Sequence, residues 1–377
     1  MVLHSANCGG ISIMRTGTRL GIARCRIRRA WNGTNAPSTT EIMAASYMAT
    51  AISYRNTTTT IPGWVPTIHN DHPRGYAYET DSHFVHFYGR DGGLWVQSSG
   101  LTATEAKSGS LDDWIDSVFG AQTKAMVKHE VGTVTDGVWR PGLYYDDQIL
   151  QALDTDRVER RGAEQSLYVL VERLNELLLY IEPEAAGIDA YGPKSRELLI
   201  LAATEAENVW AQYMRRANIT PSGQGYNTQD YVRLSGPLHL AEYEVFLAAY
   251  AHAPKVRPFH GWVSTQPTKS LGWYDAYNKA KHDRSANLSL ATLLRCIEAV
   301  AANLILFSVR FGPYSLYQQS TPLASLVNHL FTLELVDCDP ATFYVPLVKL
   351  PSTIRTDLVC DETKSYVVPW SIEPLVV

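Results

Sequence analysis

The sequence has 377 residues, 45% hydrophobic and 19% charged, a composition that excludes disorder over the whole length. At this length we expect about two or three domains. The net charge of −5 includes +6 from six arginines in residues 1–40, so the remaining residues carry −11. This negative charge argues against a broad surface that binds nucleic acid, but it allows a local basic groove.

Residues 1–40 are expected to form a basic, disordered arm. The stretch RTGTRLGIARCRIRR lacks the continuous apolar segment of a secretory signal, and its composition has some of the look of an organellar transit peptide. An upstream start codon or a disordered arm explains the same composition, with Met43 as the alternative start.

Residues 41–145 are predicted to form a small α+β region. Loops rich in Thr, Ser, Asn and Pro surround one short helix near residues 41–52. Aromatic and β-branched residues over 75–98, interrupted by glycines, predict two or three strands with a hairpin near RDGG. The stretch SLDDWIDSVFG then predicts a short helix with Ser110 as its N-cap.

The clearest periodic patterns lie in residues 146–313. Apolar residues recur at steps of three and four over 164–181, which predicts an amphipathic helix, and a second such helix is expected over 195–216. Glu205 lies at the edge of the buried stripe of the second helix. A buried unpaired carboxylate is costly, so we expect Glu205 to be structural and to have a partner.

Three further segments are predicted to have regular structure. Residues 237–253 predict a short helix, and a Pro-broken loop follows it. Residues 286–312 are apolar nearly all round, which predicts a helix in the middle of a bundle. In the tail, residues 322–335 predict a helix-like run, and the Val-rich, Pro-punctuated segments after it predict edge strands or extended packing.

The polar stretch GWYDAYNKAKHDR, residues 272–284, carries the main functional hypothesis. If it is helical, one face offers a phenol, an amide and an imidazole: Tyr274, Asn278 and His282. The neighbouring face offers a phenol and two cations: Tyr277, Lys281 and Arg284. These groups suit phosphate binding and proton transfer, because histidine titrates near neutral pH and cations stabilise charge on phosphoryl oxygens.

The same residues can also be interpreted as purely structural, with no binding or catalytic site. In that interpretation Trp273 and Tyr277 are core anchors, the lysines form a solvated face, and His282 caps a helix junction. A favourable surface pair of Asp275 with Lys279, four positions apart, fits both interpretations.

The motif WYDAYNKAKHDR, the preceding RPFHGW and the apolar helix that follows resemble HEPN-type helical domains, over roughly residues 145–312. The resemblance implies a helical bundle that binds or cleaves RNA, and a homodimer whose two motifs meet across a two-fold axis. It implies catalytic roles for His282, as general acid or base, and for Asn278, which would position the 2′-hydroxyl. The implied substrate-binding residues are Lys281, Arg284 and Tyr277. Structural roles are expected for Trp273, Trp262, Phe259 and Glu205.

One position departs from the HEPN pattern. In active members an arginine precedes the histidine by five to seven positions, and this sequence has Asp275, Ala276 and Tyr277 there. The role of that arginine is vacant unless Lys281 or Arg284 supplies the cation.

The predicted fold class is α+β, mainly α. An HEPN-like helical bundle over 146–313 is its core, the small α+β region precedes it, and a C-terminal extension over 314–377 with extended or β segments packs on it. The predicted function is RNA binding, with cleavage by metal-independent acid/base chemistry, no cofactor and a cytoplasmic location. The alternative is a non-catalytic helical interaction or scaffold protein that has lost the catalytic arginine.

Other site chemistries have weaker support. The five scattered cysteines without a CxxC motif indicate a reducing compartment, and no apolar run reaches the ~18–20 residues of a membrane span. Walker, GxGxxG, GxSxG and HExxH motifs are missing from the sequence.

Four histidines within a short stretch raise the question of a metal site: His69, His72, His83 and His86. Imidazole and nearby carboxylates suit a transition metal. We favour loop and surface histidines instead, because HNDHP is typical of a loop and His83 and His86 would face opposite sides of a strand.

Overall fold

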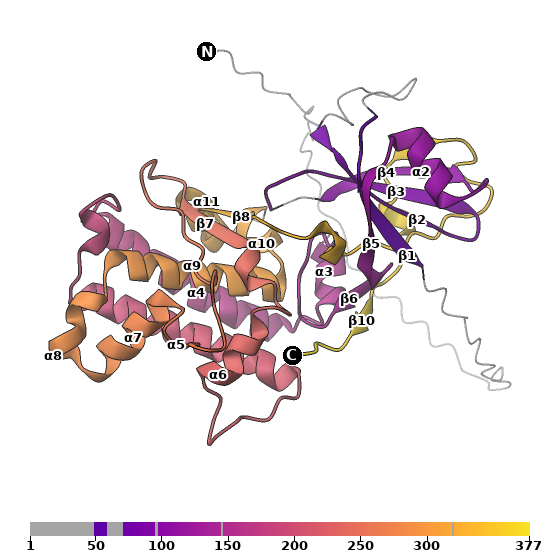
Figure 1. Cartoon of the computed structure of the whole chain (residues 1–377). Helices are drawn as coiled ribbons and strands as arrows, with labels where there is room; N and C mark the ends of the chain where they lie inside the picture. The colour runs from indigo at the N-terminus through magenta and orange to yellow at the C-terminus, as the bar shows by residue number, and fades with distance from the viewer. Residues whose placement is uncertain (1–48, 59–70, 95–96, 145, 319) are drawn as a thin grey trace, which may run out of the picture. The chain divides into compact units, whose positions relative to one another are not determined.

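A computed structural model describes residues 49–58, 71–94, 97–144, 146–318 and 320–377, all within one compact unit that spans Tyr47–Val377. In Figure 1 the colour of the described residues runs from indigo at the start of the first strand to yellow at the C-terminus. The arm predicted over residues 1–40 and the alternative start Met43 lie outside the described residues. Among the described helices, none has the length and apolar character needed to span a bilayer.

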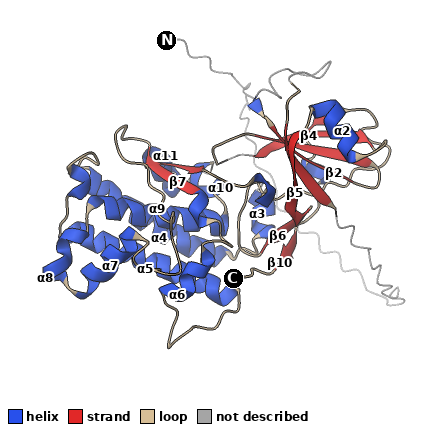
Figure 2. Cartoon of the chain, in the orientation of Figure 1, coloured by secondary structure: helices blue, strands red, loops and turns tan. Residues whose placement is uncertain are grey.

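Six strands form an antiparallel sheet in the order β5-β1-β2-β3-β4-β9, drawn in red in Figure 2. The strands are β1 Thr50–Arg55, β2 Arg74–Glu79, β3 His83–Gly89, β4 Gln97–Ala106, β5 Gln122–Glu130 and β9 Val359–Asp361. The strands predicted over 75–98 and their hairpin are confirmed, because β3 pairs with β4 across the RDGG segment.

The sheet has a hydrophobic cluster on each face, because successive side chains along a strand point to opposite sides. Tyr76 and Tyr78 of β2 belong to the main core, whereas Ala77 between them belongs to a second cluster beneath helix α2 (Leu111–Phe119). The predicted N-cap of α2 is confirmed: the Ser110 side chain accepts a hydrogen bond from the backbone N–H of Asp113 at 3.1 Å.

The helix predicted over residues 41–52 is wrong where the structure describes it. Thr50–Arg55 forms β1, which pairs with β2 on one side and β5 on the other. Its sequence TAISYR carries β-branched and aromatic residues, and its four central positions are buried. Two ladders of backbone hydrogen bonds and this burial outweigh the helix preference of the alanines nearby.

Three long helices form the helical part of the core (Figure 1): α4 Arg157–Leu178, α5 Pro193–Arg216 and α9 Leu293–Phe311. The helices predicted over 164–181 and 195–216 are confirmed. Helix α4 begins earlier than its apolar stripe, because the Asp156 side chain accepts hydrogen bonds from the N–H groups of its first turn. Helix α9 packs against both α4 and α5 and is buried on nearly every side, as its all-round apolar sequence predicts.

Two segments predicted to be helical contain strands instead. Residues 237–253 include β7 (Tyr243–Leu247), and residues 322–335 divide into helix α11 (Pro322–Leu330) and strand β8 (Phe331–Leu335). β7 and β8 pair with each other, and in both strands buried and half-buried residues alternate. This two-residue period is typical of a strand with one buried face.

The predicted fold class, mainly α with a helical bundle as its core, is therefore wrong. The fold is mixed α+β, with 43% helix and 19% strand. Aromatic residues of β2 and apolar residues of α4, α5 and α9 belong to one hydrophobic cluster, so the helices share their core with the sheet.

The remaining elements are short: β6 Thr133–Thr135, α3 Asp146–Ala152, α6 Thr228–Tyr231, α7 Gly272–His282, α8 Arg284–Asn287, α10 Tyr314–Tyr317 and β10 Ser371–Glu373. The tail contributes to more than one sheet. Its strand β9 extends the six-stranded sheet beyond β4, and β10 pairs in parallel with β6.

Candidate functional site

Helix α7 carries most of the predicted site and has one buried and one exposed side. It packs against α5 and α9, with Trp273, Tyr277 and Ala280 buried. Its last turn carries Lys279, Lys281 and His282, all exposed. Cations at this end are favourable because a helix C-terminus has a partial negative charge.

The predicted structural aromatic residues pack around a residue that the sequence analysis did not select. Trp210 of α5 is fully buried, and its ring centroid lies 5.0 Å from that of Trp262, 5.9 Å from Trp273 and 6.2 Å from Phe259. This aromatic cluster joins α5, α7 and the loop before α7. It fixes the position of α7 against the core.

A network of hydrogen-bonded side chains connects α5 to the exposed end of α7. Glu207 of α5 accepts hydrogen bonds from the hydroxyls of Tyr274, at 2.5 Å, and Tyr277, at 3.4 Å. The Tyr277 hydroxyl in turn accepts a hydrogen bond from Lys281 Nζ at 2.8 Å. The network therefore connects the partly buried carboxylate of Glu207 to the exposed ammonium of Lys281 through the buried phenol of Tyr277.

Sequence reasoning found Tyr277 and Lys281 but missed Glu207. The signal was present, because Glu207 lies four positions after Ala203 and three before Trp210, on the stripe of α5 that is buried. A carboxylate in such a stripe requires hydrogen-bond donors from a neighbouring element. Which element supplies them depends on the packing of α7.

The protonation states of Lys281 and Tyr274 in this hydrogen-bonded network follow from their contacts. The hydrogen bond to the Tyr277 hydroxyl raises the pKa of Lys281, which therefore stays a cation at neutral pH. Burial, strengthened by the hydrogen bond to Glu207, raises the pKa of Tyr274 well above its ordinary value. Tyr274 therefore stays a neutral donor.

Replacement of Tyr277 by phenylalanine is expected to lower the pKa of Lys281. The ring stays beneath Lys281, whose Nζ lies 5.0 Å from the ring centroid, so Lys281 loses only its hydroxyl acceptor. Glu207 loses only the long hydrogen bond from the same hydroxyl. The pKa is measured by NMR titration of the lysine side chains, with Lys279 as the control because its partner is Asp275. An unchanged Lys281 titration would contradict the assigned hydrogen bond.

The hydrogen bond between Lys281 and Tyr277 makes a small contribution to the stability of the fold, and this contribution depends on pH. Because the pKa of Lys281 is raised on folding, the contact stabilises the fold below the ordinary lysine pKa of about 10.4, and this contribution is lost as the pH rises through the folded value. Lys281 is exposed, so the contribution is screened by solvent.

His282 and Arg284 lie at the corner where α7 ends and α8 begins. Both side chains are exposed, and neither has a hydrogen-bond or ion-pair partner among the residues that the structure describes. Asp283 between them caps α8 by accepting a hydrogen bond from the N–H of Ala286 at 3.1 Å. The cap at this junction is thus Asp283, and His282 is left open to solvent.

Asn278 is directed to its own helix. Its side-chain nitrogen donates a hydrogen bond to the Tyr274 carbonyl oxygen at 3.0 Å, and no described contact joins it to His282. Its side-chain oxygen remains as an acceptor. The structure thus brings Tyr277 and Lys281 together and leaves Asn278, His282 and Arg284 as separate groups on the α7–α8 corner.

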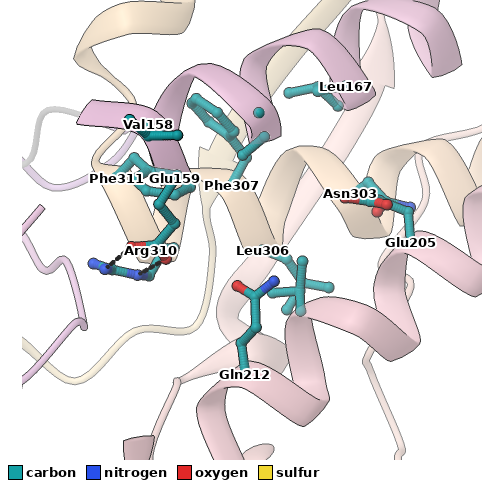
Figure 3. Close-up of a pocket in the computed structure, with 13 residues that line it drawn as sticks. Val158, Glu159, Leu167, Glu205, Gln212, Asn303, Leu306, Phe307, Arg310 and Phe311 are labelled. Carbon is teal, nitrogen blue, oxygen red and sulfur yellow. Dashed lines mark hydrogen bonds and ion pairs between the residues drawn. The ribbon is translucent and has the colours of Figure 1, made fainter. Parts of the chain in front are cut away.

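Glu205, predicted to be structural, lies elsewhere. It is half-buried beside a pocket between α4, α5 and α9, which Figure 3 shows. Its contact is with Asn208, whose side-chain nitrogen donates to it at 3.4 Å.

The histidines considered for a metal site have other contacts. The prediction of loop and surface histidines is wrong for His83 and His86, which are buried in strand β3. His72 lies in a loop, as predicted, but it is buried, and His69 lies outside the described residues. The ring nitrogens of His83 and His86 contact the Ile354 carbonyl oxygen at 2.5 Å and the Tyr54 hydroxyl at 2.6 Å. Across the described part of the chain, no three potential ligands form a metal-binding group.

Comparisons with models of protein families, with curated proteins and with solved structures find no match to this chain. The resemblance of residues 145–312 to HEPN domains stays a prediction that rests on the motif in the sequence.

Proposed function

We propose that the α7–α8 corner binds RNA through its phosphate backbone. The observation that carries the proposal is the exposure of His282 and Arg284 without partners beside Lys281, whose cationic state is favoured by Tyr277. Unpaired arginine and lysine at a surface bind phosphate without first breaking an ion pair. The aromatic cluster around Trp210 gives this corner a rigid support.

The same groups suit metal-independent cleavage. His282 would remove the proton from a ribose 2′-hydroxyl, whose oxygen attacks the adjacent phosphorus, and the departing 5′-oxygen takes up a proton. The Asn278 side-chain nitrogen has a second hydrogen besides the one donated to the Tyr274 carbonyl oxygen, and this hydrogen would be donated to the 2′-oxygen and so orient the hydroxyl. Lys281 and Arg284 would stabilise the charge that develops on the phosphate.

A second candidate function is a non-catalytic interaction protein. The observation that favours it is the hydrogen bond from Asn278 to its own helix, together with the missing arginine at positions 275–277. In this case the corner would bind an acidic partner, or RNA, without chemistry. The two candidate functions differ in what replacement of His282 would change: the rate of RNA cleavage in the first, and only the affinity for the bound partner in the second.

Replacement of Arg284 by alanine is expected to weaken binding of a fluorescein-labelled single-stranded RNA and to reduce the slope of log affinity against log salt by about 0.7, the value for one phosphate contact. Lys255→Ala is the matched control, because Lys255 is an exposed cation already paired with Glu244. Fluorescence anisotropy over a salt series measures both. Equal slopes for the two variants, or no RNA binding by the unaltered chain, would refute the proposal.

Cleavage is tested separately with the same RNA in EDTA. Products that end in a 2′,3′-cyclic phosphate, lost in His282→Ala while RNA affinity is largely kept, would support catalysis at His282. Binding without products would favour the second candidate. Cleavage that persists in His282→Ala would exclude the assigned role.

Two further parts of the proposal concern the setting of the protein. A cytoplasmic location would give the corner access to RNA, and a homodimer would bring two corners together across a two-fold axis. Cell fractionation and light scattering of the purified chain test these statements.

A further inference from the structure

A pocket between α4, α5 and α9 has a volume of about 240 Å³ and lies apart from the α7–α8 corner. Its wall is mainly apolar, with Leu167 from α4, Val209 from α5, and Leu306 and Phe307 from α9. A cavity of about 150 Å³ holds a benzene molecule, so this one has room for a ring with a short chain. Pockets of this kind fix a ligand through a few polar groups.

Asn303 supplies an acceptor to this pocket. The residue is only 4% exposed, and its side-chain nitrogen uses both hydrogens, donating to the carbonyl oxygens of Ala202 at 2.9 Å and Ala299 at 2.8 Å. These bonds fix the amide so that its oxygen is the remaining group. No described residue donates to that oxygen, which lines the pocket and is free to accept a hydrogen bond from a bound molecule.

Glu205 supplies a negative charge on the same side of the pocket, where Figure 3 draws it with Asn303. Its carboxylate has one long contact, with Asn208 at 3.4 Å, and no ion-pair partner among the described residues. A carboxylate and an amide oxygen both accept hydrogen bonds. The long contact from Asn208 is therefore the one hydrogen bond that described residues donate to these two acceptors.

The cation at the other side is already neutralised. Arg310 donates to Glu159 through two nitrogens, at 3.0 and 2.7 Å, and its third nitrogen donates to the Leu153 carbonyl oxygen at 2.9 Å. Figure 3 draws the Arg310–Glu159 pair away from Glu205. With this pair neutral, the charge of the pocket wall is that of Glu205 alone.

We propose that this pocket binds a small organic cation, a primary ammonium on an apolar body about the size of one ring and a short chain. The ammonium would donate hydrogen bonds to Glu205 and to the Asn303 oxygen, and the apolar body would contact Leu306 and Phe307. An anionic ligand would be repelled by Glu205, and the described residues of the pocket wall include no unpaired cation to bind it. A neutral ligand would leave the negative charge of Glu205 without a counter-charge. This inference is independent of the RNA proposal.

The test uses the full chain and three probes of one shape: 2-phenylethylamine, 2-phenylethanol and 3-phenylpropanoate. Isothermal titration calorimetry is expected to show binding of the amine only, and the amine alone is expected to raise the melting temperature. Glu205→Gln should weaken amine binding about 10- to 100-fold, the loss expected for one charge-assisted hydrogen bond.

Glu197→Gln is the matched control, because Glu197 is an exposed glutamate on the same helix. It should keep amine binding unchanged, and Glu205→Gln should keep RNA binding unchanged. An unaltered melting temperature of the free Glu205→Gln variant would show that it folds. Equal binding of the alcohol or the carboxylate, no binding of the amine, or equal amine affinity of the two variants would overturn the proposal.

Discussion

Replacement of Trp210 by alanine is expected to lower the free energy of unfolding by about 3–5 kcal/mol, the range for a buried tryptophan truncated in a core. Trp210 is fully buried, and its ring contacts aromatic rings from three separate segments: Tyr231, Trp262 and Trp273. Its indole N–H has no hydrogen-bond partner among the described residues, so the loss is one of packing and of the cavity that remains. Urea unfolding followed by circular dichroism measures the change.

Tyr180→Ala is the control for this substitution. Tyr180 is 82% exposed, so its loss is expected to change the free energy of unfolding by no more than about 0.5 kcal/mol. Because the Trp210 cluster supports α7, Trp210→Ala should also weaken RNA binding at the α7–α8 corner. A loss of less than about 1 kcal/mol for Trp210→Ala would mean that the cluster is not packed as described.

Replacement of Arg310 by alanine is expected to cost about 3 kcal/mol, at the lower end of the range for breaking a buried ion pair. The Arg310 side chain is 6% exposed, and its removal leaves the Glu159 carboxylate without its donors. The Leu153 carbonyl oxygen keeps only the longer contact from Arg216, at 3.4 Å. Glu159 is 32% exposed, so water compensates part of the loss. Denaturant unfolding at neutral pH measures this change.

Arg173→Ala is the matched control, since Arg173 pairs with Glu176 at 3.4 Å on the exposed side of α4. This exposed pair is expected to contribute no more than about 0.5 kcal/mol. A double replacement of Arg310 and Glu159 by methionine should recover part of the lost stability, because no unpaired charge is then left. If Arg310→Ala cost no more than Arg173→Ala, the buried pair would have no stabilising role.

The helices that the sequence predicted well are those whose pattern is local and long. In α4 and α5 the apolar residues recur over several turns, so an error at one position does not change the period. The cap of α2 is local in the same way, because Ser110 and Asp113 are three residues apart.

The strands β7 and β8 were mistaken for helices because each is five residues long. A short apolar run fits a strand and a helix equally well, and the choice depends on its partner. Here the partner lies far along the chain, since Tyr243 pairs with Leu335. The same long-range pairing converts Thr50–Arg55 into β1 and makes the fold mixed rather than mainly helical.

For the candidate site, spacing alone predicted the proximity of Tyr277 and Lys281, because residues four apart on a helix are neighbours. Spacing also suggested that Asn278 and His282 share a face, but it did not predict that Asn278 would bond to its own helix. Glu207 and Trp210 join the site only because α5 packs against α7. The pocket at Glu205 likewise requires α9 beside α5.

The sequence by itself determined the long amphipathic helices, the capped helix α2 and the polar, basic character of α7. These depend on residues within a few turns of one another, so their physical causes are contained in the local pattern. The tertiary structure alone decided which short segments pair as strands, which carboxylate meets Tyr274 and Tyr277, and which acceptors surround the pocket at Asn303. Those outcomes depend on burial and on hydrogen bonds between residues far apart in the chain, whose free energies exceed local conformational preferences.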